Sequence, residues 1–244
     1  MTEYQGSENN NYNLDRRDFL KSAAVLGASL TNLIGISNAF AHDPKIEESN
    51  KKTKERIKKR IYSKDGKTYL RISDLIDLEI VNPKVTGVPD EYEDPLNTGV
   101  PLVKIGECDL ERNITKNFKI SEYTLIPEPS INKGKNIPVY INNGHTYHQY
   151  IRIDPDLVQR VQDLRNEYKA PIVIRSRYRN KTYNAKLKTP GKPNSRHKTG
   201  QALDITGKDL PKLKKLAKKH FKEDGVGIYD TFVHVDTRGF KALW

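Results

Sequence analysis

The chain has 244 residues, of which 35% are hydrophobic and 30% are charged, and its formal net charge at pH 7 is +12. This length suits one medium-sized domain with a targeting segment and a small additional region. The hydrophobic fraction is low, but Ile, Leu and Val recur in patterned segments, so a wholly disordered chain is excluded. The single cysteine, Cys108, excludes an intramolecular disulfide and a cysteine-based zinc cluster, and we expect it to be a small, partly buried residue.

The excess positive charge lies outside the first 41 residues. These carry three basic and four acidic residues, which leaves 40 basic against 27 acidic residues, or +13, for the rest of the chain. A basic surface can meet nucleic acid, an anionic membrane or an anionic wall polymer. No aromatic-interleaved nucleic-acid motif accompanies the lysines, so we interpret them as solvated helix faces and tails and expect no nucleic-acid partner.

The N-terminus has the features of an export signal. An arginine pair opens the segment Arg16-Arg17-Asp18-Phe19-Leu20-Lys21, an apolar run extends from Ser22 to about Ala39, and a small-x-small pattern ends at Ala41. The segment resembles a twin-arginine (Tat) signal, a route that carries folded proteins. Polar residues inside the run make it weak as a membrane-spanning helix. We therefore predict a signal peptide over residues 1–41, cleaved after Ala41 and not kept as an anchor, and a periplasmic or cell-wall-associated protein.

The exported part divides by composition. Residues 42–65 are rich in Lys and Glu and are interpreted as a charged flexible leader or a solvated helix. Residues 66–116 contain short apolar stretches broken by Pro and Gly, which favours accessory strands and loops of unknown role. Residues 117–244 form the main domain.

The pattern sharpens after about residue 150. Asp154 and Pro155 predict a helix start, with an apolar face formed by Leu157, Val158, Val161 and Leu164. Residues 171–174 are typical of a buried strand, residues 210–222 of a second helix with its lysines outward, and residues 228–236 of a strand. This mixture predicts an α+β fold, a small antiparallel sheet with flanking helices.

Two short segments hold the candidate chemistry. In 232–236, strand alternation places His234 and Asp236 on the face opposite two valines. In 202–205 the same alternation points Asp204 away from the core, and His197 lies one turn earlier. Two imidazoles and one carboxylate are a suitable ligand set for catalytic zinc, with a fourth position open. The spacing alone also fits ordinary polar groups.

The residues around these positions carry a resemblance to a known family. The segment that ends at Asp204 is similar to the zinc motif of the M15 family of D-Ala-D-Ala carboxypeptidases, murein endopeptidases and phage endolysins. The residues of this segment are Ser195-x-His197-x-x-Gly200-x-Ala202-x-Asp204. Further segments resemble the family in the same order: 117–123, 152–155, 171–179, 183–185, 225–229 and 232–236. The resemblance covers residues 117–240 and leaves 42–116 unexplained.

The resemblance implies a zinc hydrolase with His197, Asp204 and His234 as ligands, set in a cleft on the sheet. It also implies that Arg179 binds substrate near the scissile carbonyl or its carboxylate, the alternative being a structural salt bridge. Ser195 and the neighbouring Tyr178 are candidate substrate-binding residues. For Ser195, a turn or cap role is the alternative.

Two departures from the family pattern concern the chemistry. Related enzymes have an acid/base side chain three residues before the last ligand, where this chain has Thr231. Asp230 is favoured as the base if a bulge brings it into place, whereas Asp236 acts as base or orients His234. Arg177 stands where the family often has glycine and would add positive charge to the cleft.

Three other histidines have weaker claims. His145 and His148 have i, i+3 spacing, but the preceding Asn-Asn-Gly predicts a turn and argues against a metal site. His220 suits the negative end of a helix.

These features favour an exported murein endopeptidase that acts on peptidoglycan peptide as a monomer. A D-Ala-D-Ala carboxypeptidase is the alternative enzyme. A non-catalytic zinc-containing cell-wall binding protein is the alternative of another class, and a nucleic-acid binder is suggested by charge alone.

Overall fold

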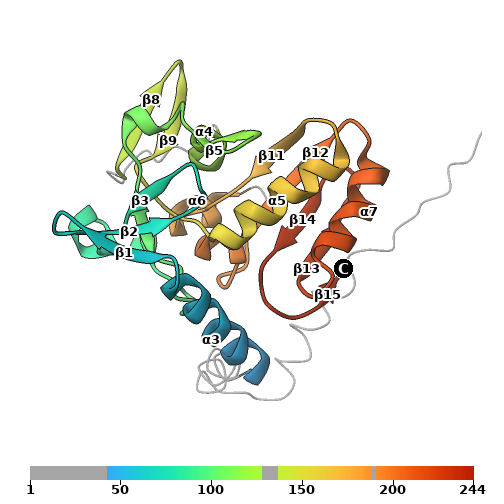
Figure 1. The fold of residues 1–244 in the computed structure, drawn as a ribbon, viewed down its shortest axis with the longest axis horizontal. Helices are drawn as coiled ribbons and strands as arrows, with labels where there is room; N and C mark the ends of the chain where they lie inside the picture. The colour runs from blue at the N-terminus through green and yellow to red at the C-terminus, as the bar shows by residue number, and fades with distance from the viewer. Residues whose placement is uncertain (1–42, 128–136, 188–190) are drawn as a thin grey trace, which may run out of the picture. The chain divides into compact units, whose positions relative to one another are not determined.

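In the computed structural model, which describes residues 43–127, 137–187 and 191–244, the largest sheet has five strands in the order β11-β12-β14-β13-β15 (Figure 1). Neighbouring strands are antiparallel, except that β15 runs parallel to β13. The strands are β11 (Ile172–Ser176), β12 (Ala202–Gly207), β13 (Gly225–Ile228), β14 (Val233–Asp236) and β15 (Ala242–Leu243). The predicted α+β fold with a small antiparallel sheet and flanking helices is confirmed.

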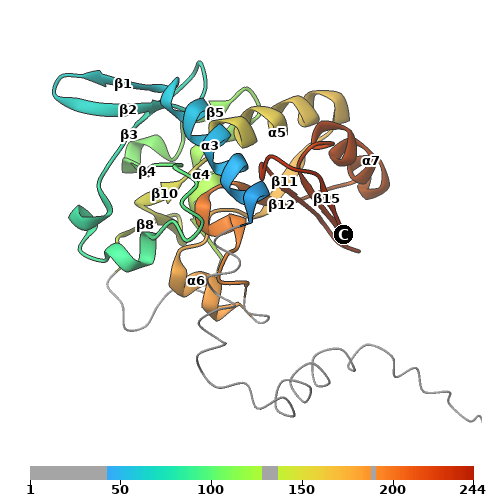
Figure 2. The same cartoon turned by 90° about the horizontal axis from the view of Figure 1, so that it is seen from below.

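Two helices lie side by side next to this sheet, α5 (Pro155–Tyr168) and α7 (Leu210–His220) (Figures 1 and 2). The side chain of Asp154 accepts a hydrogen bond from the backbone N–H of Asp156, so it caps α5 as predicted. The apolar residues predicted for both helices are buried with the inward residues of β12 and β14. They are Leu157, Val158, Val161, Leu164, Leu213, Leu216, Phe221, Leu203, Ile205, Val233 and Val235. This packing leaves the other face of β12 and β14 for polar side chains.

Residues 44–64 are folded, so the flexible-leader interpretation is wrong for them and the helix alternative is correct for 44–58. Helix α3 (Pro44–Lys58) is followed by β1 (Ile61–Lys64). Arg56 of the helix forms ion pairs with Asp154 at 2.6 Å and with Asp156 at 3.0 Å. Because its buried positions are mostly polar, the helix has little apolar signal in the sequence; the buried residues are Ser49, Asn50, Thr53 and Ile57.

Residues 61–127 and 137–152 form short strands, turns and short helices, in line with the short strands and loops predicted for 66–116. Strands β2 (Lys67–Arg71) and β3 (Asp77–Glu79) pair with β1 in a three-stranded sheet of the order β1-β2-β3. Within residues 44–244, this sheet lies on the opposite side from α7 (Figures 1 and 2). Three further small sheets pair β4 (Leu102–Lys104) with β10 (Tyr150–Arg152), β5 (Asn113–Thr115) with β6 (Phe118–Lys119), and β9 (His145–His148) with both β7 (Leu125–Ile126) and β8 (Val139–Asn142). The other helices of the described ranges are η2 (Pro83–Thr86), η3 (Pro89–Tyr92), η4 (Glu107–Asp109), α4 (Ile120–Thr124), α6 (Lys181–Lys186) and η5 (Arg196–Thr199).

One hydrophobic core joins these parts, because buried residues from Ile57 to Val235 belong to a single cluster. Arg152 is buried within the early segments. Its guanidinium donates to the Tyr92 carbonyl at 2.8 and 3.2 Å and to the Val100 carbonyl. The accessory segments and the main domain are therefore packed as one folded unit.

Two local predictions need correction. Residues 228–236 are not one strand: β13 and β14 form a hairpin, in which Tyr229 N–H donates to the Phe232 carbonyl at 3.1 Å and Asp230 and Thr231 lie at the turn. The alternation of polar and apolar residues is interrupted at this turn, because Asp230 and Thr231 are both polar and Phe232 and Val233 are both apolar. Cys108 is exposed in η4 and not partly buried.

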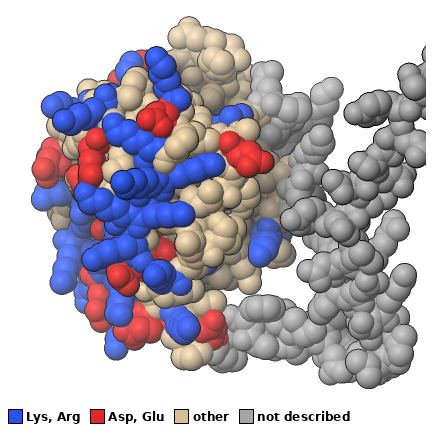
Figure 3. Space-filling model, turned by 90° about the vertical axis from the view of Figure 1, so that its right-hand side faces the viewer, with Lys and Arg blue, Asp and Glu red and all other residues tan. Residues whose placement is uncertain are grey.

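The basic residues gather on the face that carries α7 (Figure 3). Several lysines of this region are exposed while the apolar residues face the core, which agrees with a solvated helix face. The exposed lysines are Lys212, Lys215, Lys218, Lys219 and Lys222. The predicted signal peptide, residues 1–41, lies outside the described residues. Within the described ranges, no helix has both the length and the apolar character needed to span a bilayer.

Candidate metal centre

Two neighbouring strands and one short turn bring the predicted ligands together. Asp204 of β12 and His234 of β14 are direct cross-strand partners. Their side chains share the face of the sheet opposite the buried valines of β14. His197 lies in η5, immediately before β12, and its turn ends at Gly200.

The glycine of the motif has a physical reason. Gly200 has φ 71°, in the left-handed region, and a Cβ there would collide with the carbonyl oxygen of Arg152. The Gly200 carbonyl also accepts a hydrogen bond from Asp154 N–H at 3.0 Å. This close approach ties the His197 turn to the start of α5.

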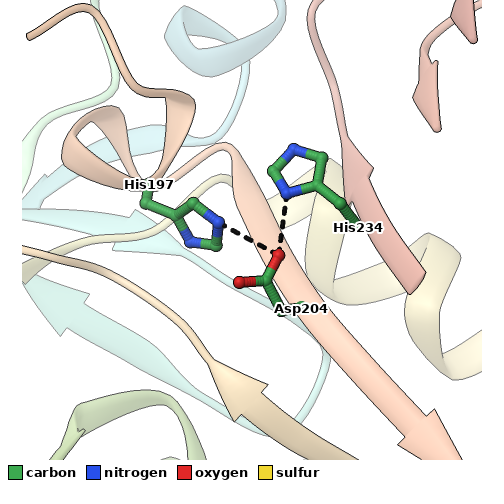
Figure 4. Close-up of side chains that lie close together, drawn as sticks. All are labelled: His197, Asp204 and His234. Carbon is green, nitrogen blue, oxygen red and sulfur yellow. Dashed lines mark hydrogen bonds and ion pairs between the residues drawn. The ribbon is translucent and has the colours of Figure 1, made fainter. Parts of the chain in front are cut away.

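The three side chains point toward one another (Figure 4). Asp204 Oδ1 lies 2.8 Å from His234 Nδ1 and 3.3 Å from His197 Nε2, and one ligand atom of each residue lies within 4.8 Å of the others. Ligand atoms around a tetrahedral zinc with bonds of about 2.0 Å are about 3.3 Å apart. The spacing therefore fits a small metal ion.

Both imidazoles are oriented by a partner on their far side. His197 Nδ1 lies 2.9 Å from the Arg177 carbonyl, and His234 Nε2 lies 3.2 Å from Asp236 Oδ2. Each of these acceptors favours a proton on the nitrogen that it faces. When the other nitrogen is deprotonated, its lone pair points toward Asp204, as metal-bound histidines in proteins require.

The electrostatics of the group also suit a cation. Burial opposes the ionisation of Asp204, but the two imidazoles outweigh it and hold the pKa of this carboxyl well below its usual range. Burial lowers the pKa of His197. Burial also lowers the pKa of His234, but hydrogen bonds to Asp204 and Asp236 outweigh it and raise the pKa to about 9. A metal bound by His234 Nδ1 must therefore displace a proton.

Arg179 reaches the same carboxylate. Its Nη2 donates to Asp204 Oδ2 at 2.8 Å and its Nε donates to Ser176 Oγ at 2.8 Å. A register shift in β11 between Ile174 and Ser176 places Ser176 opposite Asp204. The alternative considered for Arg179, a structural salt bridge, is present, and it places a positive charge beside the candidate ligands.

Two predicted substrate-binding residues make other contacts in the structure. Ser195 caps η5, accepting from His197 N–H at 3.4 Å, which is the cap alternative, and it is half-exposed. Tyr178 is buried and its ring packs 5.5 Å from that of His148, so its side chain does not face solvent. Arg177 is also buried. Its guanidinium donates hydrogen bonds to the carbonyls of Leu125 and Ile174. The positive charge of Arg177, which was predicted for the cleft, therefore lies inside the fold.

The candidate acid/base residues have very different surroundings. Asp230 is exposed at the hairpin turn, and β14 pairs without a bulge from Val233 to Asp236. Asp236 is buried and accepts from His234 and from Arg238 Nε and Nη2. Burial would raise the pKa of Asp236, but these bonds outweigh it and keep the pKa well below its usual range. Asp236 is thus a positioning residue for His234 and a poor base.

Three neighbours of the site were missed by sequence reasoning: Arg238, Tyr229 and Trp244. The Trp244 ring lies 5.4 Å from that of His234, and Arg238 lies 4.7 Å from the Trp244 ring. The Gly225-x-Gly227 spacing was the available signal, because a Cβ on Gly225 or Gly227 would collide with Arg238 or Trp244, respectively.

The weaker histidine candidates are placed as expected: His145 is exposed after a turn, and His220 binds Glu167 at 2.9 Å.

The fold and the site thus define an α+β domain with a possible His/Asp/His metal-binding group. Residues 136–236 match the model of a family described as Peptidase M15. This range lies within the predicted 117–240 and contains all three candidate ligands, so the match supports a peptidase. No curated protein and no solved structure is significantly similar to the chain.

Proposed function

We propose that this protein is an exported zinc metallopeptidase that hydrolyses peptide bonds in peptidoglycan stem peptides or crosslinks. The observation that carries the proposal is the convergence of His197 Nε2, Asp204 Oδ1 and His234 Nδ1 within a segment that matches a peptidase family. Zinc held by such ligands polarises a carbonyl group and lowers the pKa of a water molecule.

The chain's own residues have defined roles in this proposal. The Arg177 carbonyl and Asp236 fix the two imidazoles, and Arg179 holds the second oxygen of Asp204. The guanidinium of Arg179 also adds a fixed positive charge beside the site. A preorganised cation of this kind stabilises negative charge that develops on a carbonyl oxygen during hydrolysis.

Export and location belong to the same proposal. The twin-arginine-like segment supports passage across the membrane in the folded state, and cleavage after Ala41 leaves a periplasmic or wall-associated monomer. The substrate is then peptidoglycan peptide. A D-Ala-D-Ala carboxypeptidase is the alternative activity for the same group of residues.

One observation favours a second candidate, a non-catalytic zinc-containing cell-wall binding protein. The position expected to hold an acid/base residue is Thr231, whose carbonyl accepts from Thr206 Oγ1 at 2.9 Å. Asp230 is exposed at the turn, and Asp236 is engaged by Arg238. Among the described residues, no hydrogen bond or ion pair joins Asp230 to the three candidate ligands.

Digestion of purified peptidoglycan by the zinc-loaded protein, followed by mass analysis, tests the proposal. Monomers released from crosslinked dimers identify an endopeptidase, and loss of one alanine mass identifies a carboxypeptidase. His197→Ala is expected to abolish the product, whereas His145→Ala, which changes an exposed histidine, is the matched control and is expected to retain it. Zinc-loaded protein that gives no product contradicts the enzyme and favours the binding protein.

A further variant tests the acid/base assignment. If Asp230 transfers the proton, Asp230→Asn lowers turnover by about 10²-fold or more while zinc stays bound. Unchanged turnover in Asp230→Asn rejects Asp230 as the base.

A further inference from the structure

The hairpin beside the candidate metal centre carries a group of exposed aromatic side chains. Tyr229 and Trp244 are 41% and 47% exposed, and Phe232 is half-buried. The Tyr229 and Phe232 rings stack with centroids 4.3 Å apart, and Trp244 Nε1 donates to Tyr229 Oη at 3.0 Å. We call Tyr229, Phe232 and Trp244 the aromatic ledge. Large exposed apolar groups that lie together usually mark a binding surface.

The fold makes room for this ledge. Gly227 is the cross-strand partner of His234, and a Cβ at Gly227 would lie 2.7 Å from Trp244 Nε1. The Trp244 carbonyl accepts from Ile228 N–H at 2.7 Å, and Trp244 N–H donates to the Val226 carbonyl at 3.2 Å. The indole is therefore fixed by backbone pairing over a glycine and is not a loose surface side chain.

The ledge is continuous with the candidate ligands. The Trp244 ring centroid lies 5.4 Å from that of His234, and the Arg238 guanidinium lies 4.7 Å from the Trp244 ring centroid. Arg238 in turn binds Asp236, the carboxylate that orients His234. A molecule held on the ledge would therefore lie directly beside the metal-binding residues.

The chemistry of the ledge selects its ligand. It offers partly exposed aromatic rings together with two polar groups, the Tyr229 hydroxyl and the Arg238 guanidinium, which lies over the Trp244 ring. A pyranose ring has the complementary form, with a face of C–H groups and hydroxyls at its edge. A methyl or other small apolar side chain is instead best held in a concave pocket.

We propose that the aromatic ledge binds a pyranose sugar of the glycan strand, and so selects stem peptides that are attached to glycan. This inference rests on the proposed cell-wall substrate. Trp244 is a specificity-determining residue in this account, and Tyr229 positions it.

The chain itself provides the probe, because Trp244 is its one tryptophan. Tryptophan emission of the zinc-loaded and the metal-free protein is titrated with an N-acetylglucosamine tetrasaccharide and, separately, with a free stem peptide. Saturable change of the emission with the tetrasaccharide is the expected result. No change, or a change with the peptide alone, overturns the proposal.

Variants separate the ledge from the rest of the surface. In calorimetric titrations of the tetrasaccharide, Trp244→Ala is expected to weaken binding about tenfold, the usual effect of losing one aromatic contact. Trp244→Phe, which keeps a ring, is expected to weaken it less. Tyr62→Ala disrupts a different stacked tyrosine pair, Tyr62 with Tyr69, and is expected to leave the affinity unchanged. Equal affinity of Trp244→Ala and the parent protein contradicts the ledge.

The tetrasaccharide contains no peptide bond, so these titrations do not depend on hydrolysis. If the protein binds the tetrasaccharide through Trp244 but releases no peptidoglycan fragment, the result supports sugar binding by the ledge and rejects the proposed peptidase activity. If the protein cleaves peptidoglycan but does not bind the tetrasaccharide, the result supports the peptidase activity and rejects sugar binding by the ledge.

Discussion

Replacing His148 by leucine is predicted to make the protein less sensitive to mild acid. His148 is fully buried in β9, next to the Tyr178 ring. Among the described residues, neither of its ring nitrogens has a hydrogen-bond partner. Burial and, secondly, the charge of Arg177 lower the pKa of His148 to about 3.

The size of the effect follows from this pKa. In the unfolded chain His148 takes up a proton at about pH 6.5, whereas in the folded protein it stays neutral down to about pH 3. The unfolded state therefore binds more protons between these values, and stability falls as the pH falls through this window. At about 1.36 kcal/mol per pH unit, His148 alone removes about 2 kcal/mol at pH 5, which is 1.5 units below 6.5.

Urea denaturation at pH 7 and pH 5 measures this contribution. His148→Leu is expected to lose about 2 kcal/mol less than the parent protein between the two pH values. His145→Leu, the same substitution at an exposed position of the same strand, is the control and is expected to follow the parent protein. Equal losses in His148→Leu and the parent protein would refute the assignment of the acid sensitivity to His148.

Three further predictions concern the site and its support. Asp236→Asn is expected to weaken zinc binding 10- to 100-fold in competition with a chelator, because the charge that orients His234 is lost; an unchanged affinity would show that Asp236 is not needed. Gly227→Ala is expected to displace the indole of Trp244 and shift its emission to the red, and an unchanged spectrum would contradict the close packing. Arg152→Met leaves two buried carbonyls without their guanidinium donor and is expected to cost about 2 to 4 kcal/mol in urea denaturation; a loss below about 0.5 kcal/mol would reject that role.

The elements that depend on local patterns were predictable. Strand alternation alone placed Asp204 and His234 on the face opposite the buried valines, and the pairing of β12 with β14 confirms it. The start of α5 was likewise visible, because Asp154 and Pro155 form a local cap. In both cases the residues that decide the structure are close together in the sequence.

The features that depend on distant partners were not predictable. Helix α3 buries polar residues, and Ser49 donates to the carbonyl of Arg238, almost 190 positions later. The sequence of α3 therefore has the composition of a solvated segment. Trp244 lies beside His234 only because β15 runs parallel to β13 at the edge of the sheet. The Gly225-x-Gly227 spacing indicates that a side chain approaches this strand closely, but it does not indicate which side chain.

Zinc stoichiometry is the most direct test of the central claim that His197, Asp204 and His234 form a metal site. The parent protein and His145→Ala are expected to retain about one zinc per chain after dialysis, as measured by elemental mass spectrometry. His197→Ala is expected to retain almost none, with its fold checked by circular dichroism. A parent protein that binds no zinc, or a folded His197→Ala variant that retains a full equivalent, would contradict the account.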